Sequence, residues 1–316
     1  RDCAGRVSLS TWRDDGYMTL KTVGKRLMAL QLVVILLTAC ATAPPRVHQN
    51  MRVETDDLAM VSEWAHTMAE AFGTRQVLVV YDIDNTLLAM EQGLGSDQWY
   101  YWQKELAAQD PCSEKLVSDR LAAQGALYYA SGMRPTQPDA ALQLRHVQDA
   151  GIRAIAITSR GSDYQLQTFR ELRRNNMSFW PNALPPRRGW PDPFVPEGGS
   201  RPALYQDGVF LTSGQHKGKM LEALLKKTGT TPPGIIIMVD DKQENLDAMM
   251  ESFKATDTSV HDWRYTREDE NVAAFDSEKA FLQWQQLAPA LRVIEGTLGP
   301  DHFSLPAVQE RAGCSD

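Results

Sequence analysis

The sequence predicts an α/β fold in which helices cover a doubly wound, mainly parallel sheet. Apolar, β-branched runs at residues 77–81 and 235–239 are typical of strands that are buried on both faces, and the periodic run at 152–157 is typical of a further strand. Segments with helical spacing of apolar residues lie before and between these runs. In such a sheet, ligands bind at the carboxyl ends of the strands, so the residues that follow each run are the candidate site.

The composition is that of an ordinary globular protein. The chain has 316 residues, of which 43% are hydrophobic and 23% charged, and this length allows one domain with insertions or two domains. Removing residues 1–39 takes away six basic and three acidic residues and changes the formal net charge from −7 to −10. An acidic body argues against nucleic-acid binding, which requires a basic face.

The start of the chain has the pattern of a secretory signal. Residues 1–17 are interpreted as upstream residues, and Met18 as a better start. Basic residues and then an apolar run, residues 27–37, follow Met18, and this run is shorter than the ~20 residues of a comfortable membrane span. The run ends in Leu37-Thr38-Ala39-Cys40, which resembles a bacterial lipobox with Cys40 as the lipidated residue. We favour this interpretation over a plain signal anchor with a chance cysteine.

A lipoprotein of this kind is expected in the cell envelope of a Gram-negative bacterium. The resemblance implies attachment to the membrane through a lipid anchor at Cys40. By the same resemblance, Ala41 favours the outer membrane, facing the periplasm.

The first elements of the mature chain are a tether and a helix. Residues 40–53, which include two prolines, are predicted to form the tether. Thr55 or Asp56 is predicted to cap a helix that runs to about Phe72 and ends at Gly73. The run at residues 77–81 is then the first of the buried strands.

A large insertion is predicted after the first strand. The next strand begins about seventy residues later, whereas a plain crossover needs only ~30. Residues 90–137 are therefore predicted to be a largely helical insertion. It begins with an aromatic cluster that either contacts a substrate or, as we favour, packs as the insertion's own core, namely Trp99, Tyr100, Tyr101 and Trp102.

The remaining chain continues the alternation of helices and strands. The predicted elements are a helix from Pro138 to Ala150, a strand at residues 152–157, a proline-rich irregular loop at 180–202, a hairpin at 203–212, a helix after Lys217, strands at 235–239 and 259–265, and a closing helix at 275–287.

Aspartates gather at two predicted strand ends. Asp82 and Asp84 follow the first strand and could act on the same substrate, although an Asx-rich turn would have the same residues. Asp240 and Asp241 follow the strand at 235–239. Two adjacent carboxylates repel each other unless a cation or a partner offsets them.

These motifs resemble those of the haloacid dehalogenase (HAD) superfamily. Asp82-Ile83-Asp84-Asn85-Thr86 is similar to its first motif, and Thr158, Lys217 and the pair Asp240-Asp241 match the next three in order. The resemblance implies a HAD-type, Rossmann-like sheet with a helical cap inserted after the first strand. The implied organisation is upstream residues and signal peptide at 1–39, tether at 40–53, core at 54–89 and 138–298, cap at 90–137, and a C-terminal tail at 299–316.

The resemblance also implies an activity, that of a phosphatase which hydrolyses small phosphomonoesters through an aspartyl-phosphate. Asp82 would be the nucleophile, and Asp84 the general acid and base. Thr158 and Lys217 would bind phosphate. Mg²⁺ would be held by Asp82, the backbone carbonyl of Asp84, Asp240 and, through water, Asp241.

Two alternatives bear on this activity. Secreted acid phosphatases of the superfamily have Glu where Asn85 stands, and Gly95-Ser96-Asp97-Gln98-Trp99 looks closer to an uncharacterised bacterial branch. A non-catalytic envelope lipoprotein that binds a phosphorylated ligand or partner is the competing hypothesis. A dinucleotide dehydrogenase is disfavoured because no Gly-x-Gly-x-x-Gly follows the first strand.

Some residues stay without an assigned role at this point. Cys112 and Cys314 could pair in an oxidising compartment or remain free thiols. Arg160 could reach a phosphate or a carboxylate of the insertion, and Arg187 and Arg188 could attract anions or be a solvated pair on a loop.

Overall fold

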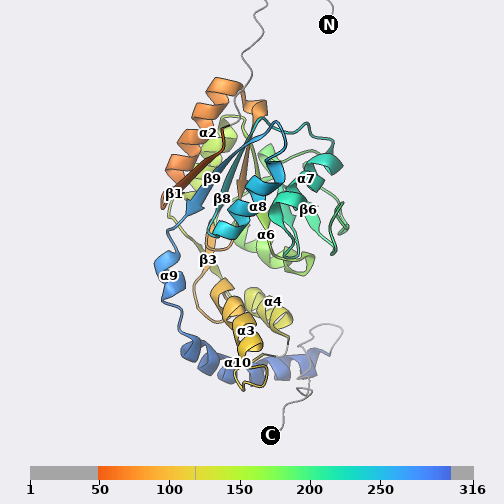
Figure 1. The fold of residues 1–316 in the computed structure, drawn as a ribbon. Coiled ribbons are helices and arrows are strands. Elements are labelled where there is room, and N and C mark those ends of the chain that lie inside the picture. The colour runs from red at the N-terminus through yellow and green to blue at the C-terminus, as the bar shows by residue number, and fades with distance from the viewer. Residues whose placement is uncertain (1–48, 118, 300–316) are drawn as a thin grey trace, which may run out of the picture. The chain divides into compact units, whose positions relative to one another are not determined.

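The protein is built on a mainly parallel sheet with helices on both faces. The computed structural model describes residues 49–117 and 119–299. Within these residues a seven-stranded sheet has the order β1-β9-β8-β2-β5-β7-β6, and every neighbouring pair is parallel except β6–β7 (Figure 1). The predicted α/β class is confirmed.

The elements that the sequence predicts occur in the predicted order, and further elements that it did not predict lie among them. The strands are β1 (Met51–Thr55), β2 (Val77–Tyr81), β3 (Leu88–Met90), β4 (Met133–Pro135), β5 (Arg153–Thr158), β6 (Leu204–Gln206), β7 (Val209–Leu211), β8 (Ile235–Asp240) and β9 (Ser259–Tyr265). The helices are α2 (Leu58–Phe72), α3 (Asp97–Gln109), α4 (Arg120–Ala130), α5 (Ala140–Asp149), α6 (Gln165–Arg174), α7 (Lys217–Thr228), α8 (Gln243–Phe253), α9 (Asp269–Ala273) and α10 (Ser277–Leu298).

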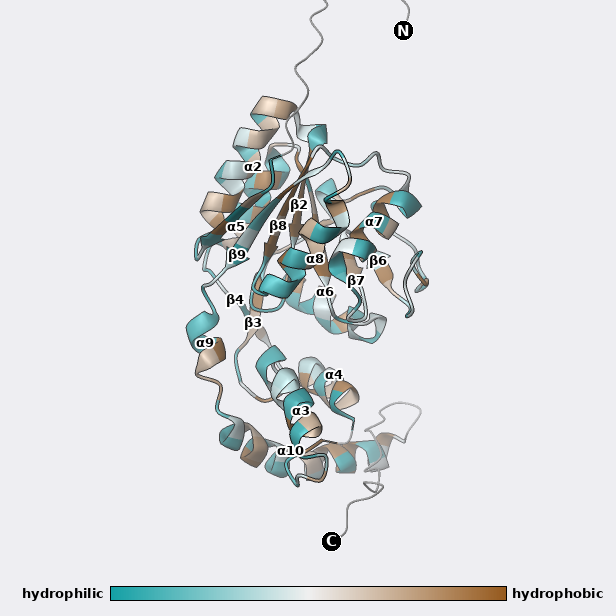
Figure 2. Cartoon of the chain, viewed as in Figure 1, coloured by the Kyte–Doolittle hydropathy of each residue, from teal (hydrophilic) through white to brown (hydrophobic). Residues whose placement is uncertain are grey.

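The central strands are buried on both faces, because a different set of helices covers each face of the sheet. Alternate residues of β2 belong to two separate apolar clusters: Val79 packs with α2 and α5, whereas Val80 packs with α7 and α8. Figure 2 shows the hydrophobic β2 and β8 between helices whose outer sides are largely hydrophilic. This two-sided burial explains why these strands are continuous apolar runs.

Helices α3 and α4 belong to the long segment that is inserted between β3 and β4. Strands β3 and β4 pair antiparallel, Leu88 with Pro135, so the two ends of the inserted segment (residues 91–132) are held together. Trp99, which is fully buried, belongs to a third apolar cluster, to which this segment also contributes Leu94, Ala123 and Leu127. Trp102 packs against the same cluster, so the interpretation of these two aromatic residues as internal packing is confirmed.

Helix α10 differs from its prediction in both length and place. It extends to Leu298, although Pro289 removes a backbone donor and usually ends a helix. Its residues Ala280 and Trp284 pack in the cluster around Trp99, so α10 joins the inserted segment rather than the sheet core to which residues 138–298 were assigned. The spacing of apolar residues along the sequence of α10 predicts an apolar face, but it does not predict which part of the protein covers that face.

The N-terminal boundary also differs from its prediction. The tether was expected through residue 53, yet Met51–Thr55 forms strand β1, which pairs in parallel with β9. Asp57, rather than Thr55 or Asp56, caps α2, and its carboxylate accepts a hydrogen bond from Ala59 N at 2.9 Å. The hairpin β6–β7 is confirmed.

Several sequence predictions lie outside the described residues, namely the signal peptide, Cys40, the C-terminal tail and Cys314. Cys112 is in a disulfide in the structure, and its pairing with Cys314 stays a prediction. Across residues 49–117 and 119–299, no helix combines the length and the apolar character that crossing a bilayer demands.

Candidate functional site

Strand register places the first and last predicted motifs side by side. Strands β2 and β8 pair in parallel, with Tyr81 opposite Val239, so the residues that follow them, Asp82 and Asp240, emerge next to each other. Asp82 N donates to Val239 O at 2.9 Å and continues the ladder by one residue. Parallel pairing therefore brings together two aspartates that are far apart in the sequence.

The turn after β2 fixes the second aspartate of the pair at residues 240–241. Asn85, within this turn, has a left-handed backbone with φ of 57°, which Asn tolerates better than most residues. This turn directs Thr86 toward β8, where its hydroxyl accepts a hydrogen bond from Asp241 N at 3.0 Å. The bond links the two strand ends that carry the carboxylates.

Three buried carboxylates form an acidic triad: Asp82, Asp240 and Asp241. Each offers an oxygen that lies within 4.8 Å of the others, and together they could hold a metal ion. Lys217, in the first turn of α7, is also buried, and its Nζ lies 2.7 Å from Asp82 and 2.7 Å from Asp240. Asn245 also donates to Asp240 Oδ1, at 2.9 Å.

The charges of the triad are not balanced by direct contacts among the described residues. Lys217 supplies the one ammonium in contact with the three carboxylates there, in a buried place where unpaired charge is costly. Burial, opposed by Lys217, raises the pKa of Asp82 to about 7, and burial together with Asp240 raises the pKa of Asp241 well above its usual value. Asp241 Oδ1 is buried and has no hydrogen-bond partner among the described residues. These features fit a bound cation, and oxygen ligands alone suit a hard one.

Asp84 lies beside the triad, but its side chain is not part of it. Arg160 donates to both of its oxygens, from Nε at 2.9 Å and from Nη2 at 2.8 Å, and the hydroxyl of Tyr128 donates to Oδ1 at 2.8 Å. Burial by itself would raise the pKa of Asp84, but Arg160 and Tyr128 lower it below its usual value. Asp84 is therefore held as an anion.

Thr158 joins the site through its neighbour in the chain. It ends β5, the strand beside β2, and its buried hydroxyl accepts a hydrogen bond from Arg160 N at 3.2 Å. The guanidinium of Arg160 also donates to Thr168 and lies over the ring of Tyr128, so the arginine is fixed on several sides. The role left open for Arg160 is thus, in this structure, that of a partner to Asp84.

A second ion pair joins the inserted segment to the sheet. Asp97, at the start of α3, lies 2.6 Å from the Nζ of Lys242, which directly follows the acidic pair at the end of β8. The same Nζ lies 3.8 Å from the ring centroid of Tyr101. Of the predicted aromatic cluster, Tyr101 therefore faces the site, whereas Trp99 faces the apolar cluster.

Sequence reasoning missed the partners supplied by the inserted segment, Asp97, Tyr101 and Tyr128. A signal existed for Asp97, because it lies within the stretch Gly95 to Trp99 that resembles the uncharacterised bacterial branch. No comparable signal marked Tyr128, since its place depends on how α4 packs.

Arg187 and Arg188 do not join this group of residues. Both side chains are exposed and lie against the ring of Trp180 in the proline-rich loop, at 6.0 and 5.8 Å from its centroid. The interpretation as a solvated pair on a loop fits this position.

The fold and the site define a class: an α/β protein with a buried carboxylate cluster at the carboxyl edge of its parallel sheet. Comparison with family models then identifies the family. The chain belongs to the family described as "Protein of unknown function (DUF2608)", whose model matches residues 57–294. The match includes the triad, Lys217, Arg160 and the inserted segment. A search of curated proteins found no match. Membership assigns no activity, so the function must be argued from the site.

Proposed function

We propose that the protein is a Mg²⁺-dependent phosphomonoester hydrolase of the HAD superfamily that acts through an aspartyl-phosphate. The observation that carries the proposal is the environment of Asp82. Its carboxylate lies at the carboxyl end of a central strand, touches the ammonium of Lys217, and shares a cation-competent cluster with Asp240 and Asp241. A nucleophilic carboxylate among positive groups is what phosphoryl transfer requires.

The proposed reaction has two displacements. A carboxylate oxygen of Asp82 forms a bond to phosphorus as the bond to the leaving oxygen breaks, and the leaving oxygen takes a proton from the protonated form of Asp84. Water then attacks phosphorus, the bond to Asp82 breaks, and Asp84 takes the proton of the water. Lys217 holds the phosphoryl charge, with Thr158 as a further hydrogen-bond partner.

Magnesium would be held by Asp82, Asp240 and Asp241, with the backbone carbonyl of Asp84. When bound, it would supply positive charge that offsets the carboxylates and the phosphoryl oxygens.

The contacts of Asp84 shape this proposal. An anionic Asp84 suits the base of the second displacement, whereas the acid of the first must carry a proton. Because Arg160 and Tyr128 occupy both oxygens of Asp84, we expect substrates with good leaving groups to react fastest. A nitrophenyl phosphate, whose leaving group needs no proton, should therefore exceed an alkyl phosphate in turnover.

The inserted segment is proposed to be the cap of this hydrolase. Its helices reach the site at two points, Tyr128 to Asp84 and Asp97 to Lys242. Such contacts support a segment that controls access to the carboxyl edge of the sheet.

The central test is covalent labelling of Asp82. Residues 41–316 are mixed with a ³²P-labelled nitrophenyl phosphate, with Mg²⁺ or with chelator, and quenched rapidly. We expect Mg²⁺-dependent turnover in the parent, background activity in Asp82→Asn, and trapped label in Asp84→Asn, because positioned proton transfer is worth typically 10²–10⁴-fold. Asp149→Asn, an exposed change on α5, is the control.

Two outcomes would contradict the hydrolase. Turnover in Asp82→Asn equal to that of the parent would place the chemistry elsewhere. Tight phosphate binding without any turnover in the parent would support the competing function, a non-catalytic lipoprotein that binds a phosphorylated ligand or partner.

We further propose that the hydrolase is anchored in the envelope, through a lipid at Cys40, in the outer membrane facing the periplasm. The lipobox-like stretch before Cys40 supports this location. Metabolic labelling with a radioactive fatty acid should mark the parent but not Cys40→Ser. Label that persists in the variant would contradict the anchor.

A further inference from the structure

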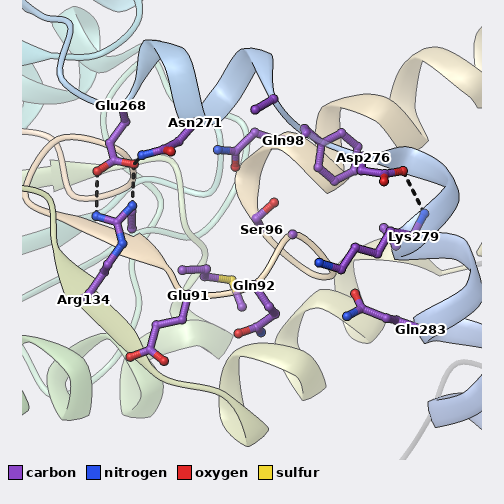
Figure 3. A pocket seen from close by; sticks show the side chains of 16 residues that line it. Glu91, Gln92, Ser96, Gln98, Arg134, Glu268, Asn271, Asp276, Lys279 and Gln283 are labelled. Carbon is purple, nitrogen blue, oxygen red and sulfur yellow. Dashed lines mark hydrogen bonds and ion pairs between the residues drawn. The ribbon is translucent and has the colours of Figure 1, made fainter.

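A second, polar cavity lies apart from the acidic triad. Its volume is about 450 Å³, and none of Asp82, Asp84, Lys217 or Asp240 lines it. Its walls come from β3 and the loop after it (residues 89–98), from Arg134 on β4, and from the α9–α10 region (residues 268–283) (Figure 3). This volume is within the usual range of small-molecule sites, ~300–1,000 Å³.

One charged pair on the wall is already satisfied. Arg134 and Glu268 form a bidentate ion pair, with distances of 2.7 and 2.8 Å, and Asn271 donates to the same carboxylate at 2.9 Å (Figure 3). These three groups close one end of the cavity without needing a ligand.

Two other polar groups on the wall, on Gln98 and Lys279, lack partners among the described residues. Gln98 Oε1 is buried and accepts no hydrogen bond from any described residue. Lys279 lies on α10, and Figure 3 shows its side chain extending into the cavity toward Ser96. No carboxylate among the described residues pairs with its Nζ. The wall therefore offers an unused acceptor and an unused cation to the same space.

The charges and the apolar part of the wall narrow the chemistry of a ligand. Three carboxylates line the cavity, Glu91, Glu268 and Asp276, against two cations, Arg134 and Lys279. The free ammonium of Lys279 favours an anionic group, and the excess of carboxylates together with the carbonyl of Gln98 favours a group that carries N–H donors. The cavity wall also has an apolar part, to which Met90 and Phe275 contribute.

We propose that this cavity binds a small zwitterion of the amino-acid or dipeptide kind. Its carboxylate pairs with Lys279, and its ammonium group donates to Gln98 Oε1. Because Gln98 belongs to the inserted segment and Lys279 to α10, the ligand bridges these two parts of the wall and stabilises their arrangement. This inference does not depend on the proposed phosphatase activity.

The test uses the dipeptide alanyl-alanine and two blocked forms. The methyl ester lacks the carboxylate, and the N-acetyl form lacks the ammonium. Binding to residues 41–316 is measured by calorimetry and by melting temperature. We expect alanyl-alanine to bind and to raise the melting temperature, and each blocked form to bind about tenfold more weakly, the effect of one charge-assisted hydrogen bond.

Two variants assign the contacts. Lys279→Ala should weaken alanyl-alanine about tenfold and make the ester and the free acid bind alike, because the partner of the carboxylate is gone. Gln98→Leu removes an acceptor that has no partner among the described residues, so it should weaken alanyl-alanine about tenfold and reduce the ligand-induced rise without lowering the melting temperature of the empty protein. Gln285→Ala, exposed on α10 outside the cavity, should behave like the parent.

Three results would overturn the proposal. The first is that the parent does not bind alanyl-alanine up to about 10 mM, a concentration at which even a ligand with a millimolar Kd is detected. The second is that the parent binds the blocked forms as tightly as alanyl-alanine. The third is that Lys279→Ala or Gln98→Leu binds alanyl-alanine as tightly as the parent does.

Discussion

Lys217→Met tests whether the acidic triad depends on its single ammonium. The side chain of Lys217 is 2% exposed, and its Nζ contacts two carboxylates at 2.7 Å. Methionine has a similar volume and keeps the helix but removes the charge. The carboxylates of Asp82, Asp240 and Asp241 are then buried together with no cation in contact.

The cost can be estimated from this geometry. Removing one partner of a buried ion pair typically costs 3–5 kcal/mol, because the remaining charge is left uncompensated. For a protein of this size, each kcal/mol changes the melting temperature by roughly 2–4 °C, so a fall of about 6–20 °C is expected. Mg²⁺ at one hundred times its Kd would recover about 2.7 kcal/mol.

The assay is chemical denaturation of Lys217→Met and its parent, with chelator and with Mg²⁺. Lys219→Met, two residues along α7 and exposed, is the matched control and should change stability by less than ~0.5 kcal/mol. The double variant Lys217→Met/Asp82→Asn should recover part of the loss, since it removes one of the unpaired carboxylates. A Lys217→Met protein as stable as its parent in chelator would refute this account of the triad.

Three further predictions concern other parts of the molecule. Burial raises the pKa of Asp262 to about 7, so the folding stability of the parent should fall as the pH rises from about 4 to 7. Asp262→Asn should therefore be more stable than the parent at pH 8, by on the order of 1–4 kcal/mol, but not at pH 4. Equal pH profiles of the two proteins in thermal denaturation would contradict this. Trp99→Ala should cost about 3–5 kcal/mol in denaturant titration, against almost nothing for the exposed Leu282→Ala, unless Trp99 is not a packing centre. Gly218→Ala places a Cβ closer to Ser252 Oγ than van der Waals contact allows, so it should destabilise the contact between α7 and α8 by about 1–3 kcal/mol, and an unchanged melting curve would count against that contact.

The carboxyl edge of the sheet could be predicted well from the sequence for a physical reason. Runs that are buried on both faces are legible as strands, and a parallel sheet brings their carboxyl ends to one edge. This reasoning suffices to expect Asp82 and Asp240 together, whereas Lys217 and Thr158 were expected there from the resemblance to the HAD motifs. The distances between Asp82, Asp240 and Lys217 agree, and Thr158 lies on β5, the strand beside β2.

The partners of Asp84 could not be predicted in this way. Whether Asp84 pairs with Arg160, and whether Tyr128 reaches it, depends on side-chain packing between β5, α4 and the first turn. The place of α10 is a similar case, because its apolar face could have covered the sheet as well as the cluster around Trp99. Strand β1 was overlooked because it is a five-residue edge strand in which only Thr55 is buried and Met51 and Val53 are half-buried, which is a weak signal.

The pairing of β1 with β9 has a consequence for biosynthesis. Met51 lies opposite His261, so β1, which begins near the first described residue, pairs with β9, the last strand of the described residues. Such non-local contacts slow folding. A chain that is still being synthesised already has Asp82, but it lacks Asp240 and the strand that β1 joins. The acidic triad is therefore assembled late, and a product that ends before Ser259 would leave β1 without its partner.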